Sequence, residues 1–127
     1  MNMELGALLG SWINSNPDTN SIALVKATDS GGRLRLQVSA VGSDGFVDWG
    51  TADAEVFAAT PDSHTGAGFT CRYKFDHGET RLQGMIMKGL LVLAQFHLFN
   101  DDSKRENYFL REYFAATHDR FSKADSR

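Results

Sequence analysis

Alternation of apolar and polar residues between short turn sequences is the feature that most constrains the fold of this chain. The segment "GFTCRYKFD" shows it best, because Phe69, Cys71, Tyr73 and Phe75 alternate with polar or charged residues. A period of two is typical of a β-strand with one face buried and the other in water. The pattern predicts eight strands, at residues 8–14, 21–28, 33–41, 49–59, 67–75, 79–87, 90–99 and 107–117.

The segments between these strands are short and rich in turn residues, such as Pro17-Asp18, Gly31-Gly32 and Lys88-Gly89. None is long enough to hold a crossover helix, so neighbouring strands are expected to be antiparallel. Closing such a meander removes its exposed edges. We therefore predict an all-β fold, a single eight-stranded antiparallel up-and-down barrel over residues 1–121, with a polar tail at 122–127.

Composition argues against several classes of partner and cofactor. Among 127 residues, 13 Lys and Arg stand against 16 Asp and Glu, and a net charge of −3 does not favour nucleic-acid binding. The single Cys71 excludes an internal disulfide and is expected to be a small buried side chain. The histidines lack metal-ligand spacing, and no apolar run reaches membrane-spanning length. With no basic signal region at the N-terminus, a cytoplasmic protein without metal or cofactor is expected.

The predicted strand at 90–99 is apolar on both faces. If Gln95 and His97 face inward, then Val92, Ala94 and Phe96 form an apolar row on the outside. An outer row of that kind indicates a subunit interface. We therefore expect a homo-oligomer, a dimer or a tetramer, that associates through this strand. The last strand is apolar in both phases, so the sequence does not assign its inward face.

The lumen of the predicted barrel has small residues on its inward positions. Ala52, Ala54 and Ala58 lie on one strand, and Gly84 lies on another. An eight-stranded barrel either packs solid or holds one small ligand. Small inward residues favour a ligand cavity. Alternatively, large neighbours such as Phe69, Tyr73 and Phe75 fill the same space.

Five short segments of the chain can be compared with known barrels: "GSWIN" (10–14), "SAVGSDG" (39–45), "GFTCRYKF" (68–75), "HGETRLQG" (77–84) and "THDRF" (117–121). Together they resemble the avidin and streptavidin family, and more broadly the calycin barrels. The "DWG" at 48–50 is also similar to that of small bacterial barrels of no assigned activity. The resemblance implies a calycin-like barrel, and by position it implies a biotin site at Asn14, Ser39, Tyr73, Thr80, His97 and Asp119.

Departures of this chain from the family's binding residues imply that tight biotin binding is not expected. Tyr73 and His97 replace tryptophans of the family's binding box, and Gln37 replaces a tyrosine donor. Simple alternation would also turn Ser39 outward, unless a bulge intervenes. Extreme affinity needs every polar atom of the ligand paired in a dry aromatic box.

Two residues near the first strand are expected to have structural roles. In barrels of this kind the opening tryptophan packs under an arginine of the last strand, which predicts that Trp12 stacks on Arg111 at the barrel floor. Asn14 shares the inward face of Trp12. Its amide either meets a ligand in the lumen or caps the adjacent turn.

The remaining candidates lie on the strand at 90–99 and in the segment "DGFVDWG". His97 is the candidate catalytic base and, with Gln95, a candidate ligand contact, or else a solvated rim residue. Glu112 and Tyr113 are weaker candidates. We predict a loop at 43–50 whose aromatics, Phe46 and Trp49, cover the ligand; alternatively the loop only stabilises the barrel end.

No specific catalytic motif is present, so three functions remain open. The first is a barrel that binds an apolar or ring-containing small molecule in its lumen. The second is a cofactor-independent cyclase or isomerase that folds a reactive natural-product intermediate in the same lumen. The third is a lectin-like module that binds sugars through surface aromatics such as Trp49.

Overall fold

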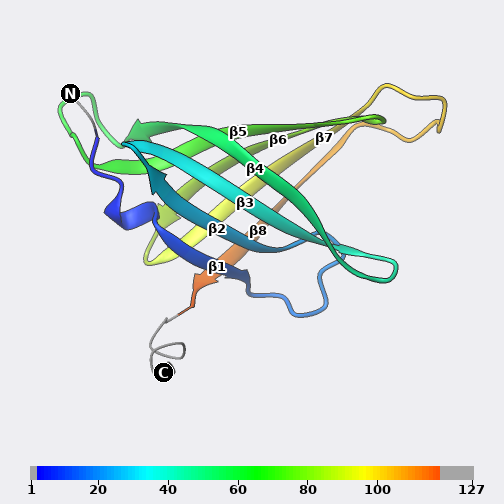
Figure 1. The fold of residues 1–127 in the computed structure, drawn as a ribbon, viewed down its shortest axis with the longest axis horizontal. Coiled ribbons are helices and arrows are strands. Elements are labelled where there is room, and N and C mark those ends of the chain that lie inside the picture. Colours follow the sequence, from blue (N-terminus) through cyan, green and yellow to red (C-terminus); the bar gives the residue numbers. More distant parts are fainter. Residues whose placement is uncertain (1–2, 118–127) are drawn as a thin grey trace.

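The computed structural model describes residues 3–117 and shows a closed barrel of eight antiparallel strands in chain order (Figure 1). This confirms the predicted fold class. A single 3-10 turn, η1, precedes the strands at Gly6–Leu8. The strands are β1 Gly10–Asn14, β2 Ile22–Ser30, β3 Arg33–Gly42, β4 Gly45–Ala58, β5 Gly66–Phe75, β6 Gly78–Met87, β7 Leu90–Phe99 and β8 Tyr108–Ala116. The predicted domain limit at 121 and the tail at 122–127 lie outside the described residues.

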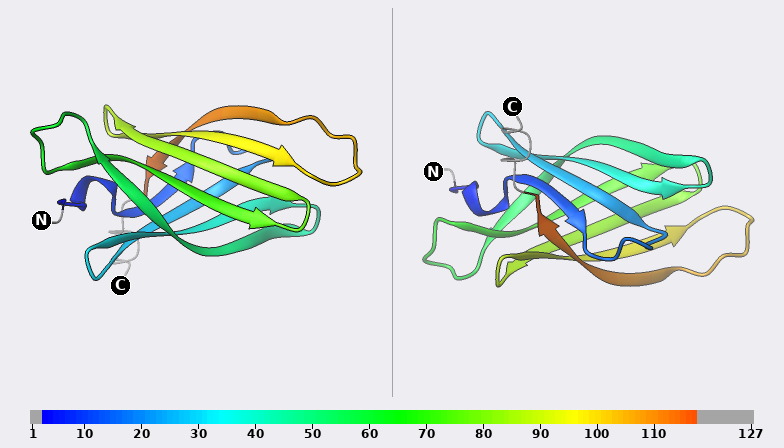
Figure 2. Two further views of the ribbon diagram at one scale, coloured as in Figure 1. Left: turned by 90° about the horizontal axis from the view of Figure 1, so that it is seen from above. Right: turned by 90° about the horizontal axis from the view of Figure 1, so that it is seen from below.

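The two ends of the barrel differ in construction. At one end, called the floor here, η1 lies beside the start of β1, and Leu8 is almost fully buried. The indole Nε1–H of Trp12 donates to the Leu8 carbonyl at 3.0 Å, which fixes the tryptophan inside the barrel. The other end, called the mouth, carries the loops at 15–21 and 100–107, and the latter extends beyond the neighbouring hairpins (Figure 2). Access to the interior is therefore closed by side chains at the floor.

Inward residues form one continuous apolar core. It includes Trp12, Ile22, Val25, Leu34, Leu36, Val38, Phe69, Tyr73, Leu82, Leu91, Leu93 and Phe114. Space expected at Gly84 is filled: a Cβ there would come within 2.5 Å of the Phe69 ring. At this level of the barrel the alternative of a solid interior is the correct one.

The segment at 43–50 is not a loop, so this prediction was wrong. β3 and β4 pair as far as Gly42 and Gly45, which leaves a turn of two residues, Ser43 and Asp44. Sequence alternation fails at this point because a β-bulge interrupts the register of β4 opposite Val38 and Ser39. Because the bulge is in β4, Ser39 keeps the outward orientation that alternation gives it. The inward placement that the resemblance implies for Ser39 is therefore wrong.

β4 and β5 pair over a short stretch only. Their register runs from Glu55 with Thr70 to Ala58 with Gly66, and the rest of the two strands forms a seam without backbone pairing. Side chains bridge this seam from inside. The Tyr73 hydroxyl lies 3.0 Å from the Gly50 carbonyl oxygen, and the Cys71 thiol lies 3.6 Å from that of Asp53. The buried position predicted for Cys71 is confirmed.

The outer surface of β4 to β8 carries an apolar face, because Gln95 and His97 point inward, which is the condition that the sequence analysis set for such a face. One cross-strand row runs from Phe57 through Gly68, Met85 and Val92 to Tyr113. Six of the ten exposed large hydrophobic residues lie around this row, and a seventh, Ile13, lies on the adjacent β1; the set is Ile13, Phe57, Met85, Met87, Leu90, Phe109 and Tyr113. We refer to this set, with Val92 and Phe96, as the outer apolar face.

Arg111 projects from this outer surface into solvent, opposite Ala94 on β7. Trp12 is buried inside the barrel, so the two side chains lie on opposite sides of the sheet and the predicted stacking is wrong.

In residues 3–117, no helix has both the length and the apolar character needed to cross a membrane.

Candidate functional site

A chain of aromatic rings curves around the mouth of the barrel. From Trp49 the contacts pass to Tyr73 and Phe75, at centroid distances of 5.5 and 5.1 Å. They continue from Phe75 to His77, Phe99, Tyr108 and finally His97. We call these seven residues the aromatic arc. Aromatic faces in this number offer stacking partners for a flat ring.

The sequence "DWG" places Trp49 in this arc. The Asp48 carboxylate accepts hydrogen bonds from the Gly50 N–H at 2.8 Å and from the Gln37 side chain at 3.1 Å. Gly50 has a φ of 86°, a conformation that favours glycine. Together they form the bulge that redirects the Trp49 indole toward Tyr73 and Phe75. The segment positions an aromatic wall, although it does so from a strand rather than from a mobile loop.

His97 ends the arc on β7 and faces Thr80 across the sheet. Its Nδ1 lies 2.9 Å from the Thr80 Oγ1, and Thr80 itself is buried. The other ring nitrogen, Nε2, is buried and has no hydrogen-bond partner among residues 3–117. Burial lowers the pKa of His97, and the electrostatic interaction with the nearby His77 ring lowers it further. The imidazole is therefore neutral at pH 7, with one polar atom unsatisfied.

Below His97, a polar network crosses the lumen. The Gln95 side chain is fully buried; its Oε1 accepts from the Ser21 hydroxyl at 2.6 Å, and its Nε2 donates to Glu112 at 3.2 Å. The second Glu112 oxygen accepts from the Thr19 hydroxyl at 2.8 Å. Sequence reasoning missed Thr19 and Ser21, which lie in a loop. It also left Glu112 without an assigned face, because β8 is apolar in both phases.

Asn14 faces the lumen, but its amide is already used by the β1–β2 loop. Its Nδ2 donates to the Ile22 carbonyl at 2.9 Å, and its Oδ1 accepts from the Asn16 N–H at 2.8 Å. Of the two roles weighed from the sequence, the structure shows turn capping.

The hydroxyl of Tyr73 is also hydrogen-bonded within the protein. It lies between the carbonyl oxygens of Leu36 and Gly50, and burial raises its pKa well above the usual range. Burial likewise raises the pKa of Cys71 to about 11. Because the thiol stays protonated at neutral pH, Cys71 is suited to packing rather than to nucleophilic attack.

The structure thus brings together Trp49, Tyr73, Thr80, Gln95 and His97 at the mouth. It leaves Ser39 outside the barrel, and Phe46 is 74% exposed on the outer part of the β3–β4 hairpin. Asp119 lies outside the described residues. Arg105, which no prediction named, places its guanidinium carbon 4.2 Å from the centroid of Phe99.

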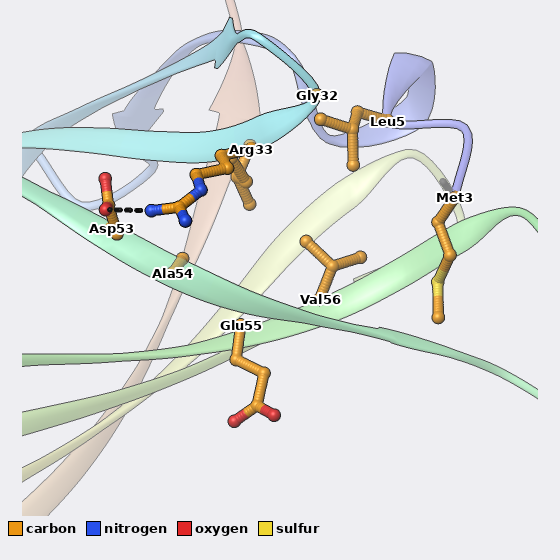
Figure 3. Close-up of a pocket in the computed structure, with 9 residues that line it drawn as sticks. Met3, Leu5, Gly32, Arg33, Asp53, Ala54, Glu55 and Val56 are labelled. Atoms are coloured by element: carbon orange, nitrogen blue, oxygen red, sulfur yellow. Dashed lines mark hydrogen bonds and ion pairs between the residues drawn. The ribbon is translucent and has the colours of Figure 1, made fainter. Parts of the chain in front are cut away.

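A pocket lies at the floor, between the N-terminal segment and β3–β4 (Figure 3). Its volume is about 460 Å³. Leu5 and Val56 point into it, Glu55 points away, and Arg33 is paired with Asp53 at its rim. The charged rim groups near this pocket are therefore largely committed to each other or to solvent. The mouth remains the stronger candidate site.

Residues 3–117 contain no cluster of three or more His, Cys, Asp or Glu side chains able to hold a metal ion. Comparison with known proteins found no matching family model, no matching curated protein and no matching solved structure. The class of the protein is therefore that of its fold: a closed eight-stranded antiparallel barrel.

Proposed function

We propose that the barrel binds a small molecule containing a flat ring, held at the mouth against the aromatic arc. The observation that carries this proposal is the buried and unpartnered Nε2 of His97. Leaving a polar atom buried without a partner is costly, and native structures rarely tolerate it without a reason. A bound molecule that reaches this nitrogen removes the penalty.

The surroundings of His97 favour a ring as the ligand. Tyr108 stacks on its imidazole, and Phe99 and Phe75 continue the apolar wall. An apolar wall with a few convergent polar groups is typical of small-molecule sites. Ser21 and Thr19 hold the side chains of Gln95 and Glu112 in place, so these two residues offer preorganised polar groups beneath the ligand.

Tryptophan fluorescence tests the proposal, because Trp49 lies in the site and Trp12 lies at the floor. In a Trp12→Phe variant, titration with 1-anilinonaphthalene-8-sulfonate and with two-ring aromatic compounds should change the Trp49 emission in a saturable way. Tyr108→Ala should weaken this binding, whereas replacement of the exposed His64 at the floor should not. An unsaturable response, or one unaffected by Tyr108→Ala, would contradict the proposal.

Catalysis at the same place is a second proposal, for a cyclase or isomerase reaction. The neutral imidazole of His97 presents a ring nitrogen that can hydrogen-bond to a reacting group of a bound substrate. Chromatography with mass detection tests this proposal. An isomerised substrate keeps its mass but changes its retention time, whereas a ligand that is only bound is recovered unchanged. The sugar-binding alternative has less support, because Trp49 packs inward on Tyr73 and Phe75 instead of forming a surface platform.

We propose kinship with avidin-like and calycin barrels at the level of strand order only. Tight biotin binding is not part of the proposal. Ser39 faces outward, and the Tyr73 hydroxyl is committed to backbone carbonyls. These two positions could not complete the hydrogen bonds that a ureido ring requires.

We further propose that a second copy of the chain covers the outer apolar face. Contiguous exposed apolar surface of this kind is uncommon on soluble monomers. The row from Phe57 to Tyr113 contains no charged residue, so the face is complementary to itself, as a two-fold interface requires.

A further inference from the structure

The hydrogen bond between Thr80 and His97 indicates which ligand the site can take, because it determines which nitrogen of the imidazole carries the proton. Thr80 Oγ1 and His97 Nδ1 are 2.9 Å apart. Each can be the donor. A neutral imidazole carries one N–H, on Nδ1 or on Nε2, and the Thr80 hydroxyl carries one O–H.

The two arrangements differ in how many buried groups they leave unpaired. If Nδ1–H donates to Thr80, the Thr80 proton needs an acceptor of its own, and among residues 3–117 this hydroxyl forms no hydrogen bond besides the one to His97. The Nε2 lone pair would then also be unpaired. If the Thr80 hydroxyl donates to Nδ1, its proton is used and only the Nε2–H is left without a partner. Fewer unpaired buried groups favour the second arrangement.

From this we infer that Thr80 fixes His97 in the Nε2–H tautomer, so that the imidazole offers a donor to the mouth. The ligand then carries a hydrogen-bond acceptor, such as a ring carbonyl or an ether oxygen, on the edge that reaches His97. This inference rests on the proposed function and narrows the ligand class. In the catalytic alternative, His97 would stabilise developing negative charge on the substrate as a hydrogen-bond donor, and would not act as the base predicted from the sequence.

The side chains around His97 are compatible with an acceptor. Tyr108 stacks on one face of the imidazole, so a ligand would have to approach Nε2 along the edge of the ring. The carboxylate of Glu112 is held by Gln95 and Thr19 and is not recorded in contact with His97. The Nε2–H therefore has no acidic partner competing for it within the described residues.

The tautomer itself can be measured without any ligand. Long-range proton–nitrogen NMR correlation on the full chain with ¹⁵N-labelled histidine should show His97 protonated on Nε2 and unprotonated on Nδ1. Thr80→Val keeps the shape but removes the hydroxyl, and should shift the population toward Nδ1–H; Thr80→Ser should retain the wild-type pattern. A wild-type His97 protonated on Nδ1 would overturn the inference.

The ligand class is tested with a matched pair of probes, coumarin and naphthalene. Both have two fused rings, but only coumarin has a ring carbonyl. One added hydrogen bond corresponds to about threefold to tenfold tighter binding of coumarin. His97→Phe should remove this preference while retaining the ring. Equal binding of both probes by the wild type overturns the acceptor inference alone, whereas binding of neither overturns the proposed function and leaves the tautomer result standing.

Discussion

The imidazole of His97 stacks on the phenol ring of Tyr108, with centroids 4.7 Å apart and ring planes 21° from parallel. The two residues are also direct cross-strand partners on β7 and β8. Facing side chains on paired strands stabilise a sheet by their mutual contact. Here the pair also holds the imidazole in one orientation above the polar network. Stability and site geometry are therefore coupled at this position.

Acidification should destabilise the barrel through His97. Its pKa in the folded chain lies below the usual value, so the unfolded chain binds a proton more readily. The free energy of unfolding should therefore fall as the pH drops below the ordinary histidine pKa, and level off below the folded one. Urea denaturation between pH 7.5 and pH 5 measures this. His97→Gln should lose less stability over the interval than the wild type, and an identical loss would contradict the assignment.

Gly84 should not tolerate a side chain. The Cβ of an alanine would lie within 2.6 Å of two atoms of the Phe69 ring, in a packed core. Overpacking of this kind costs about 1–3 kcal/mol. Gly6→Ala is the matched control, because nothing lies within 4 Å of its added Cβ. In Phe69→Leu the clash is relieved, so the two substitutions should couple in a double-mutant cycle measured by chemical denaturation.

Removing the Asn14 amide should weaken the junction between β1 and β2. Asn14→Ala leaves the Ile22 carbonyl and the Asn16 N–H without their partner, and a cost of about 1–3 kcal/mol is expected. The same change at the exposed Asn20 should be nearly neutral. Probe binding at the mouth should persist in folded Asn14→Ala, since its role is turn capping. Selective loss of binding with unchanged stability would instead assign Asn14 to the ligand.

Self-association should depend on the outer apolar face. Met85→Glu places a carboxylate in the middle of the row from Phe57 to Tyr113, and burying that charge in an interface is costly. Association should weaken by at least about a hundredfold, which corresponds to about 3 kcal/mol. Sedimentation equilibrium checks this. Phe46→Glu, on an exposed position away from this face, is the control, and a monomeric wild type would refute the interface.

Most of the fold could be predicted from the sequence, because its strands are half-buried and its turns are short. β5 shows why: Phe69, Cys71 and Tyr73 face inward, in the alternation that the sequence displays. The beginning of β4 could not be predicted. Its bulge shifts the register by one residue, and the sequence carries no periodic signal for that shift.

The candidate site was only partly predictable. Alternation showed that His97 and Gln95 share one face of β7, but both faces of this strand are apolar, so only the structure shows that this face points inward. The orientation of Glu112 could not be predicted, because β8 carries apolar residues on both faces. One face packs in the lumen and the other belongs to the outer apolar face. The contributions of Thr19 and Ser21 depend on loop geometry that brings them to residues more than seventy positions away. Local patterns do not encode such contacts.

The seam between β4 and β5 gives the bulge a second consequence. An unpaired strand edge can recruit another chain and begin aggregation. The kink at Trp49 and Gly50 twists this edge, and charged side chains such as Asp53, Arg72 and Lys74 flank it. Kinks and charges are the devices by which natural sheets resist edge-to-edge pairing. The residues that shape the mouth thus also lower the tendency of this seam to pair with another chain.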